Sequence, residues 1–249
     1  MDRILGNRVA APEQYAPDIL EPIDRTLGRS VIKGASIHIS NGWDVWHCYE
    51  LSWRVEGEGL CYFTGTLSIP ADSPFTVESK SLKLYLNSLN NKVFISNKEA
   101  IKTIERDVSA VAGGNVKVVL WSTSDLAANT FTPDRLPRPE ITQPTRRHAV
   151  EGFRSLCPVT AQPDWATVVV DIDASAFDRE TIDAAVETLR NHQGFHEQCI
   201  EDLFSRIERD LWPEYLEITG FFQRRGGIDI TPRRSSAATE PPLERLYEQ

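Results

Sequence analysis

The chain has 249 residues and lacks the marks of several large classes of protein. No apolar run approaches the roughly 18 residues that cross a bilayer, and residues 1–10 contain no apolar core of a secretory signal. Its 4 cysteines match no paired CxxC zinc pattern, and a net charge of −9 lacks the basic excess that binds a nucleic-acid backbone. We therefore expect a cytoplasmic protein with free thiols, no membrane span and no direct contact with nucleic acid.

The first half of the chain alternates between apolar and polar residues and then changes to helical spacing. The alternation predicts a half-buried strand with, on one face, Val45, His47, Tyr49, Leu51, Trp53 and Val55. A turn at 57–59 and a second alternating segment at 63–69 complete a hairpin. Two amphipathic helices follow, the second between a capping box that starts at Ser96 and a stop at Gly113. A strand over 116–121 completes the order β-β-α-α-β.

A similar order returns after the proline-rich segment 124–145. Strands are predicted near 149–156 and 166–172, helices from 178 and 195, and further strands over 216–222 and from 228. The fold class is therefore α+β, with two antiparallel sheets that are each covered by a pair of helices. We divide the chain into an N-terminal arm, a first domain, a proline-rich linker, a second domain and a loose polar tail, at 1–40, 41–125, 126–145, 146–233 and 234–249.

A cysteine and an aspartate flank a stiff, proline-containing turn in the second half. Cys157 ends one predicted strand, and Asp164 comes just before the next. A thiolate is a strong nucleophile, and a carboxylic acid can protonate the group that the thiolate attacks. The pair therefore predicts covalent catalysis, with a buried core cysteine beside a turn aspartate as the alternative.

The last predicted helix begins at residues 195–199, with the sequence FHEQC. Glu197 can accept two N–H bonds from the amidine-like edge of a guanine-type base, and His196 can relay a proton. His192, His196 and Cys199 have helical spacing for a metal, but a glycine interrupts the helix and the motif is not HExxH. We predict no metal site, and a solvated helix start with acidic residues near the helix dipole remains the alternative.

Two further segments carry charges that suit phosphate groups. Lys80 and Lys83 lie one helical turn apart. Arg225 and Gly226 lie in a glycine turn that allows close approach of the backbone to a ligand. Taken alone, the lysine segment also fits a solvated helix edge, and the arginine-glycine segment also fits an exposed hairpin turn. Neither GxGxxG nor a Walker A loop is present, so a nicotinamide cofactor needs a site outside the Rossmann type.

Together these segments resemble the family of NADPH-dependent 7-cyano-7-deazaguanine reductases. The family signature E-[S/L]-K-[S/A]-x-K-[L/Y]-[Y/F/W] is matched over residues 78–85, and the nucleophile-and-acid loop over 157–164. The substrate-binding element is matched over 195–197, and the cofactor-side turn over 224–227. The resemblance extends from about residue 43 to residue 234. It implies two fused tunnelling-fold (T-fold) domains of the long subclass, whose members form homodimers.

The resemblance also implies an activity. The enzyme would reduce the nitrile of 7-cyano-7-deazaguanine to 7-aminomethyl-7-deazaguanine, a precursor of queuosine in tRNA, with two NADPH. Cys157 would form a thioimide with the nitrile carbon, Asp164 would protonate the nitrogen, and His196 would assist proton transfer. Residues implied to bind the substrate are Val77, Glu78, Ser79, Phe195, His196 and Glu197. Residues implied to bind NADPH are Ser79, Lys80, Lys83, Arg225 and Gly226.

Three other functions fit parts of the same pattern. A purine or pterin hydrolase of the T-fold type would need zinc held by cysteine and histidine. A cysteine-dependent nitrile or amide hydrolase with Cys157, His196 and Glu197 would release ammonia and ignore NADPH. A non-catalytic assembly module would use the open faces of its sheets, and loss of the Cys157 thiol would change only its stability.

Overall fold

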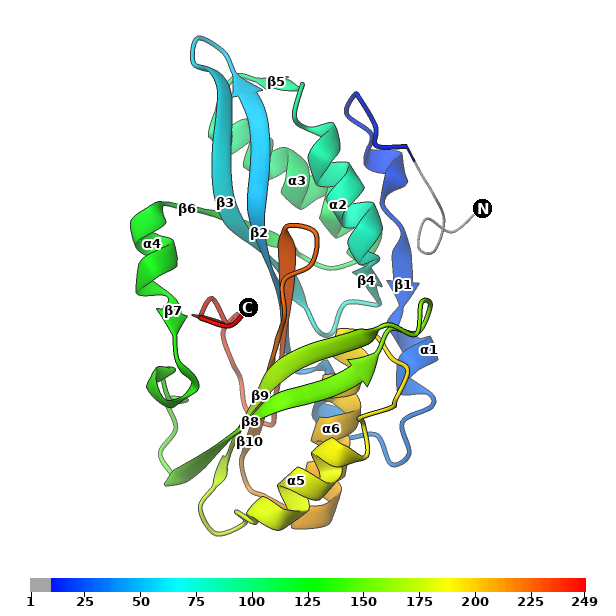
Figure 1. Cartoon of the computed structure of the whole chain (residues 1–249), viewed down its shortest axis with the longest axis vertical. Helices are drawn as coiled ribbons and strands as arrows, with labels where there is room; N and C mark the ends of the chain where they lie inside the picture. The colour runs from blue at the N-terminus through cyan, green and yellow to red at the C-terminus, as the bar shows by residue number, and fades with distance from the viewer. Residues whose placement is uncertain (1–9) are drawn as a thin grey trace.

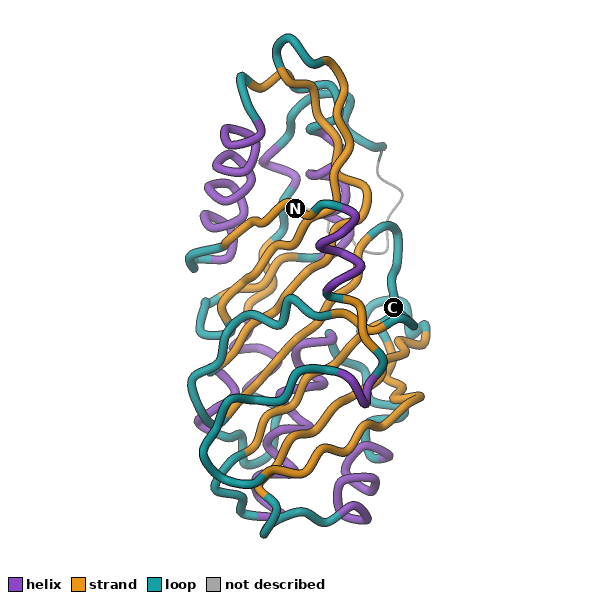
Figure 2. Tube along the Cα trace, turned by 90° about the vertical axis from the view of Figure 1, so that its left-hand side faces the viewer, coloured by secondary structure: helices purple, strands orange, loops and turns teal. Residues whose placement is uncertain are grey.

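The computed structural model describes residues 10–249, and one large sheet runs through its centre (Figures 1 and 2). Seven antiparallel strands follow one another in the order β6 (Lys117–Trp121), β3 (Gly59–Pro70), β2 (Gly42–Val55), β11 (Ile228–Ser235), β10 (Leu216–Phe222), β9 (Pro163–Asp173) and β8 (Thr145–Leu156). A short strand, β5 (Val93–Phe94), pairs in parallel with β2. Because β2 pairs with β11, the two halves of the chain share one sheet.

Two pairs of helices cover one face of the sheet, one pair over each half (Figure 1). The first pair is α2 (Ser79–Ser88) and α3 (Asn97–Ala112), and the second is α5 (Arg179–Glu187) and α6 (His196–Leu211). Each pair buries its apolar stripe against the strands, so that each half has a hydrophobic core of its own. The predicted α+β architecture, with antiparallel strands covered by helix pairs, is confirmed.

The prediction of unbroken alternation through residues 45–55 is wrong. The register of β2 against β3 shifts between Cys48 and Leu51, where two residues of β2 oppose one residue of β3. This β-bulge exchanges the faces of the strand, because side chains alternate with a period of two. The core of the first half therefore contains, from both sides of the bulge, Trp46, Cys48, Leu51, Trp53 and Val55.

The described part of the N-terminal arm is ordered and contacts both halves. Its elements are η1 (Pro17–Ile19), β1 (Pro22–Asp24), α1 (Arg25–Arg29) and η2 (Ile37–Ser40). Strand β1 pairs antiparallel with β4 (Phe75–Val77). Leu20 packs in the first core and Ile39 in the second, which anchors the arm across the junction. The predicted arm therefore contains regular elements within residues 10–40, and residues 1–9 lie outside the described part.

The proline-rich linker and the C-terminal tail pack on the other face of the sheet. The linker contains α4 (Thr123–Ala128), β7 (Thr130–Phe131) and η3 (Pro133–Arg135), and β7 pairs in parallel with β12 (Arg245–Leu246) of the tail. Leu246 is fully buried in a small core with Leu136, Val169 and Phe221. The expectation of a loose tail is wrong, because one buried leucine and a strand pairing hold it. Within residues 10–249, no helix has the length and apolar character that crossing a membrane requires.

Candidate active site

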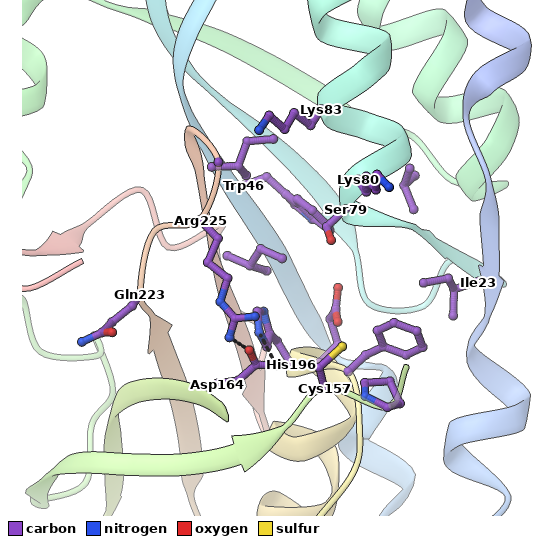
Figure 3. Close-up of a pocket in the computed structure, with 17 residues that line it drawn as sticks. Ile23, Trp46, Ser79, Lys80, Lys83, Cys157, Asp164, His196, Gln223 and Arg225 are labelled. Carbon is purple, nitrogen blue, oxygen red and sulfur yellow. Dashed lines mark ion pairs between the residues drawn. The ribbon is translucent and has the colours of Figure 1, made fainter. Parts of the chain in front are cut away.

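A cavity of about 230 Å³ opens where the two halves of the sheet meet (Figure 3). The start of α2, the loop after β8, the start of α6 and the turn before β11 form its walls, and residues of β2 and β11 form its floor. The predicted site residues that line it are Val77, Ser79, Lys80, Lys83, Cys157, Asp164, Phe195, His196, Glu197, Arg225 and Gly226. The fold thus brings together every predicted site residue except Glu78.

Cys157 lies in a tight loop between β8 and β9. Its N–H donates to the Gln162 carbonyl at 2.9 Å, and the Ala161 N–H donates to the Cys157 carbonyl at 3.0 Å. Burial opposes ionisation of the thiol, but hydrogen bonds within the loop, chiefly from Thr160, and the charge of Arg225 outweigh it. The pKa of Cys157 is therefore lowered from its ordinary value, and the loop favours the nucleophilic thiolate.

Asp164, at the start of β9, is almost fully buried beside this loop. Its Oδ2 lies 3.3 Å from His196 Nε2, and Arg225 forms an ion pair with the same carboxylate (Figure 3). The His196 ring stacks on Phe222, with 4.0 Å between the ring centroids. These contacts hold an acid and an imidazole together on the side of the cavity that carries Cys157.

Burial keeps His196 neutral at physiological pH. It lowers the pKa of the imidazole to about 4, against a smaller opposing effect of the neighbouring Glu197. A neutral imidazole donates a proton from one ring nitrogen and accepts on the other. His196 can therefore relay a proton to or from Asp164 without carrying a charge into the cavity.

Acid is expected to weaken the fold through His196. The ring protonates near pH 6.5 in the unfolded chain and near pH 4 in the folded one, so its contribution is complete above pH 6.5 and is lost as the pH falls toward 4. We expect this group to lower the free energy of unfolding by up to about 3 kcal/mol across that window. Urea titrations at pH 7 and pH 4.5 measure the change. The His196→Asn variant should lose less stability, and an equal loss would contradict the prediction.

Glu197, in the first turn of α6, brings a carboxylate to the cavity. Its Oε1 accepts a hydrogen bond from Thr76 Oγ1 at 3.2 Å. Burial, and then the charge of Asp44, raise the pKa of Glu197, and the charge of Arg25 opposes this rise. The remaining lone pairs of the carboxylate are available to a ligand with two N–H donors.

Glu78, which was predicted to bind the substrate, caps a helix at the cavity wall. It is the N-cap residue of α2, and its two carboxylate oxygens accept the backbone N–H groups of Lys80 at 2.8 Å and Ser81 at 2.7 Å. Such a cap satisfies the first N–H groups of a helix, which have no partner within it. Glu78 thus fixes the start of α2 from behind the cavity wall, and it is not one of the residues that line the cavity.

Cationic side chains lie on both sides of the turn before β11. Lys80 and Lys83 extend from α2 at the other end of the cavity, and Arg225 extends from the turn to Asp164 (Figure 3). Gly226 has a φ of 56°, and a Cβ there would lie 2.7 Å from Lys83 Nζ. Glycine therefore suits both the backbone of this turn and its close approach to α2. Three cations beside a glycine turn fit the phosphate groups of a dinucleotide cofactor.

Some residues that line the cavity could not be recognised from the sequence as part of the site. These residues are Ile23, Trp46, Gln223, Ile228 and Ile230. Trp46 is the most informative of them, because its indole Nε1 is buried and has no hydrogen-bond partner within residues 10–249. An indole N–H in this position can donate to a bound ligand. The strand pattern indicated where Trp46 lies in the chain, but it could not distinguish a cavity floor from an ordinary core.

The alternative sites are not assembled in the way that their functions require. In the part of the chain from residue 10 onward, no three His, Cys, Asp or Glu side chains gather so as to hold a metal. Cys199 is fully buried in the second core, and burial raises its pKa to about 12. His196 pairs with Asp164 through Nε2, so Glu197 does not orient it as the third member of a hydrolase triad would.

The chain is similar to known reductases along almost its whole length. The family model "Nitrile reductase, 7-cyano-7-deazaguanine-reductase N-term" matches residues 11–120, and the model "QueF-like protein" matches residues 163–241. Proteins named "NADPH-dependent 7-cyano-7-deazaguanine reductase" from Acinetobacter baumannii strains ATCC 17978 and SDF are each 39% identical over 259 residues, covering 96% of this chain and 95% of theirs. The apo crystal structure of the archaeosine synthase QueF-Like is 20% identical, with a TM-score of 0.36, and covers 40% of this chain and 100% of its own.

Proposed function

The chain belongs to the family of NADPH-dependent 7-cyano-7-deazaguanine reductases, and we infer that it reduces the nitrile of this base to 7-aminomethyl-7-deazaguanine for queuosine biosynthesis. Its helix-covered half-sheets are the tandem T-fold domains of that family. One observation carries the proposed mechanism. A thiol with a lowered pKa, a buried acid, a base-binding carboxylate and a cationic end share a single cavity.

We assign the first chemical step to Cys157. Its thiolate adds to the nitrile carbon, so a C–S bond forms while one of the two C–N π bonds breaks. Asp164, paired with His196, delivers a proton to the nitrogen as negative charge develops there. The product of this step is a neutral thioimide on Cys157, and it leaves the acid pair to be reprotonated.

The later steps use the same groups. NADPH supplies one hydride each time it binds, so the four-electron reduction of a nitrile to an amine requires two molecules. Cys157 leaves as a thiolate once the thioimide carbon has been reduced, and the lowered pKa of its thiol favours this departure. The imine then stays in the cavity, where Phe195 helps to exclude the water that would hydrolyse it. A second proton from the pair of Asp164 and His196 completes the amine.

Binding is assigned to the two ends of the cavity. Glu197 accepts the two N–H donors of the base edge, and Val77 and Ser79 line the same region. Lys80, Lys83, Arg225 and Gly226 hold the phosphates of NADPH, which fits the charge and the close approach that they create. Glu78 supports both ends indirectly, because it caps the helix from which Ser79, Lys80 and Lys83 extend.

We also propose that the chain forms a homodimer in the cytoplasm. Its four cysteines are free, which suits a reducing compartment. Large apolar side chains are exposed on the β2–β3 hairpin and around β5, and they offer a surface for a second copy: Leu60, Tyr62, Val93 and Ile95. Light scattering should give twice the chain mass of 28.1 kDa, and the mass of one chain would contradict the dimer.

The stoichiometry of the reaction tests the proposed function. Purified protein is mixed with 7-cyano-7-deazaguanine and NADPH, and the loss of nicotinamide absorbance is compared with the amine formed. We expect two NADPH to be consumed for each nitrile, because each supplies two electrons. Release of ammonia with NADPH untouched would favour the hydrolase. A nitrile that remains unchanged would refute the proposed activity altogether.

A further inference from the structure

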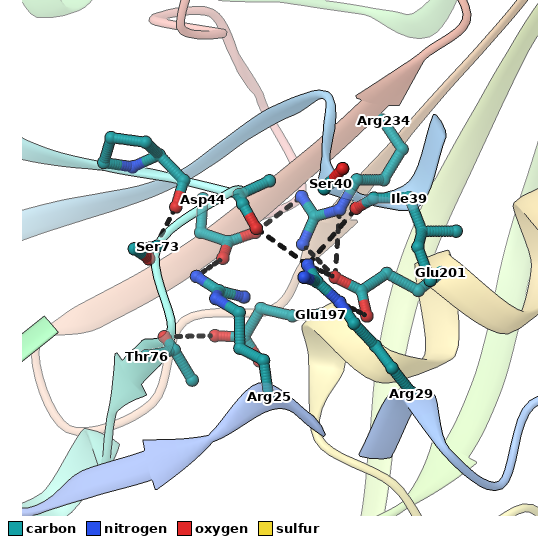
Figure 4. A network of polar contacts seen from close by, with 12 residues as sticks. Arg25, Arg29, Ile39, Ser40, Asp44, Ser73, Thr76, Glu197, Glu201 and Arg234 are labelled. Atoms are coloured by element: carbon teal, nitrogen blue, oxygen red, sulfur yellow. Dashed lines mark hydrogen bonds and ion pairs between the residues drawn. The ribbon is translucent and has the colours of Figure 1, made fainter. Parts of the chain in front are cut away.

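A buried chain of alternating charges crosses the junction between the two halves (Figure 4). Arg25 donates to Asp44 at 2.6 Å, and Arg234 donates to Asp44 at 2.8 Å. Arg234 also donates to Glu201 at 2.7 Å, and Arg29 donates to Glu201 at 2.7 Å. All of these side chains except Arg29 are almost completely buried. Each carboxylate is therefore held between two guanidinium groups, and an arginine stands at each end.

This chain of charges has one more cation than it has anions. Three guanidinium groups face two carboxylates, and an unbalanced charge in a protein interior is costly. The end formed by Arg25 also has an unused donor, because Arg25 Nε is buried without a hydrogen-bond partner in the described residues. An ionised Glu197, which lies next to Arg25, would supply the missing negative charge (Figure 4).

Several elements present polar groups to Glu197. Strand β2 presents Asp44, whose charge repels an ionised Glu197, and α1 presents Arg25, whose charge attracts it. Strand β4 presents the Thr76 hydroxyl, which donates one hydrogen bond. On α6 itself the neighbour is His196, whose charge also lowers the pKa of Glu197 when the ring is protonated, but the ring is neutral at physiological pH. Arg25 is therefore the cation of this set, and it offsets both the burial of Glu197 and the charge of Asp44.

On the basis of the function proposed above, we propose that Arg25 is a positioning residue whose buried positive charge keeps the nearby Glu197 carboxylate ionised for the base. A guanine-type edge presents two N–H donors, and both can be accepted only by a carboxylate that has lost its proton. Arg25 does not line the cavity, so it acts through Glu197. The N-terminal arm, which supplies Arg25 from α1, would then determine how tightly the second domain binds its substrate.

The Arg25→Gln variant tests this role by removing the charge while keeping a polar side chain. The KM for 7-cyano-7-deazaguanine at pH 7 should rise several-fold with little change in kcat, because loss of the guanidinium charge raises the pKa of Glu197 further and leaves less of the ionised form. Because Glu197 must lose its proton to bind the base, KM should recover as the pH is raised. Arg25→Lys should raise KM by less than Arg25→Gln does, because an ammonium keeps the charge but lacks the planar guanidinium that binds Asp44.

Arg29→Gln is the matched control. It removes the same charge from the same helix, but at the far end of the chain of charges, where Arg29 contacts Glu201. Arg29→Gln should lower the free energy of unfolding, but its KM should depend on pH in the same way as that of the wild type. Profiles of Arg25→Gln and Arg25→Lys that coincide with the wild type, or an equal shift in Arg29→Gln, would overturn the proposal. If Arg25→Gln does not fold, the Arg25→Lys profile decides alone.

Urea titrations without ligand separate this inference from the proposed function. A carboxyl group whose pKa is raised in the folded protein stabilises it at low pH, and that contribution is lost as the pH rises through the folded pKa. Arg25→Gln should therefore lose stability more steeply than the wild type between pH 5 and pH 8. This difference in pH dependence should disappear when Glu197→Gln is introduced into both the wild type and Arg25→Gln. If stability depends on pH equally in the wild type and in Arg25→Gln, the role of Arg25 is refuted, even where nitrile reduction is confirmed. If stability falls more steeply in Arg25→Gln, the role is supported, even where nitrile reduction fails.

Discussion

Replacement of Cys157 by alanine is expected to abolish nitrile reduction, with a loss of at least about 10⁴-fold in kcat. The variant lacks the atom that bonds to the nitrile carbon, and no other thiol lines the cavity among the described residues. The fold should be retained, because the Cys157 side chain is only partly buried and lies in a loop. Consumption of NADPH in the presence of 7-cyano-7-deazaguanine measures the loss, and the unfolding midpoint in urea verifies the fold.

Cys61→Ala is the control for this experiment. Cys61 is also a partly buried free cysteine, but it lies on the β2–β3 hairpin, outside the cavity. It should leave both kcat and KM unchanged. The covalent mechanism would be refuted if Cys157→Ala kept more than a few per cent of the wild-type rate. The assembly-module alternative predicts that neither the wild type nor the variant consumes NADPH and that the two proteins differ only in stability.

Replacement of Asp164 by asparagine should lower kcat about 10²- to 10³-fold, the usual contribution of a positioned acid. Asparagine has the same shape but is a far weaker acid, so the nitrile nitrogen would gain negative charge without an efficient proton donor. The KM for the base should change little, because Glu197 rather than Asp164 is assigned to the base edge. Steady-state kinetics at saturating NADPH measure both constants.

An exposed aspartate provides the comparison for Asp164. Asp134 lies in the linker, away from the cavity, and Asp134→Asn should leave kcat at the wild-type value. A variant Asp164→Asn with a normal kcat and a raised KM would show that Asp164 binds and does not protonate. A normal kcat and a normal KM together would mean that His196 or a water molecule supplies the proton.

The local chemistry of the chain could be read from its sequence because it depends on residues that are close together. The turn that separates Cys157 from Asp164 is short and contains prolines, so the two side chains have little freedom to separate. Helical spacing likewise placed Lys80 and Lys83 on neighbouring turns. The periodicity of apolar residues gave the main strands and helices, and the order of these elements gave the α+β class.

The predictions failed where the structure of a segment depends on residues far away in the sequence. The bulge in β2 follows from its register against β3, and strict alternation in β2 does not reveal it. The tail is polar along most of its length, yet Leu246 is held by residues of the linker and of two central strands.

The sequence by itself predicted the candidate reacting groups, determined most of the elements that carry them and indicated the family to which the chain belongs. The tertiary structure alone decided which of these groups share a cavity and what charge each carries there. It joined Arg25 to Asp44 and placed Glu197 within reach of both. It also lowered the pKa of His196 and placed Trp46 in the floor of the cavity. The physical reason is that burial and Coulomb energy depend on distances in space, and the sequence specifies distances only along the chain.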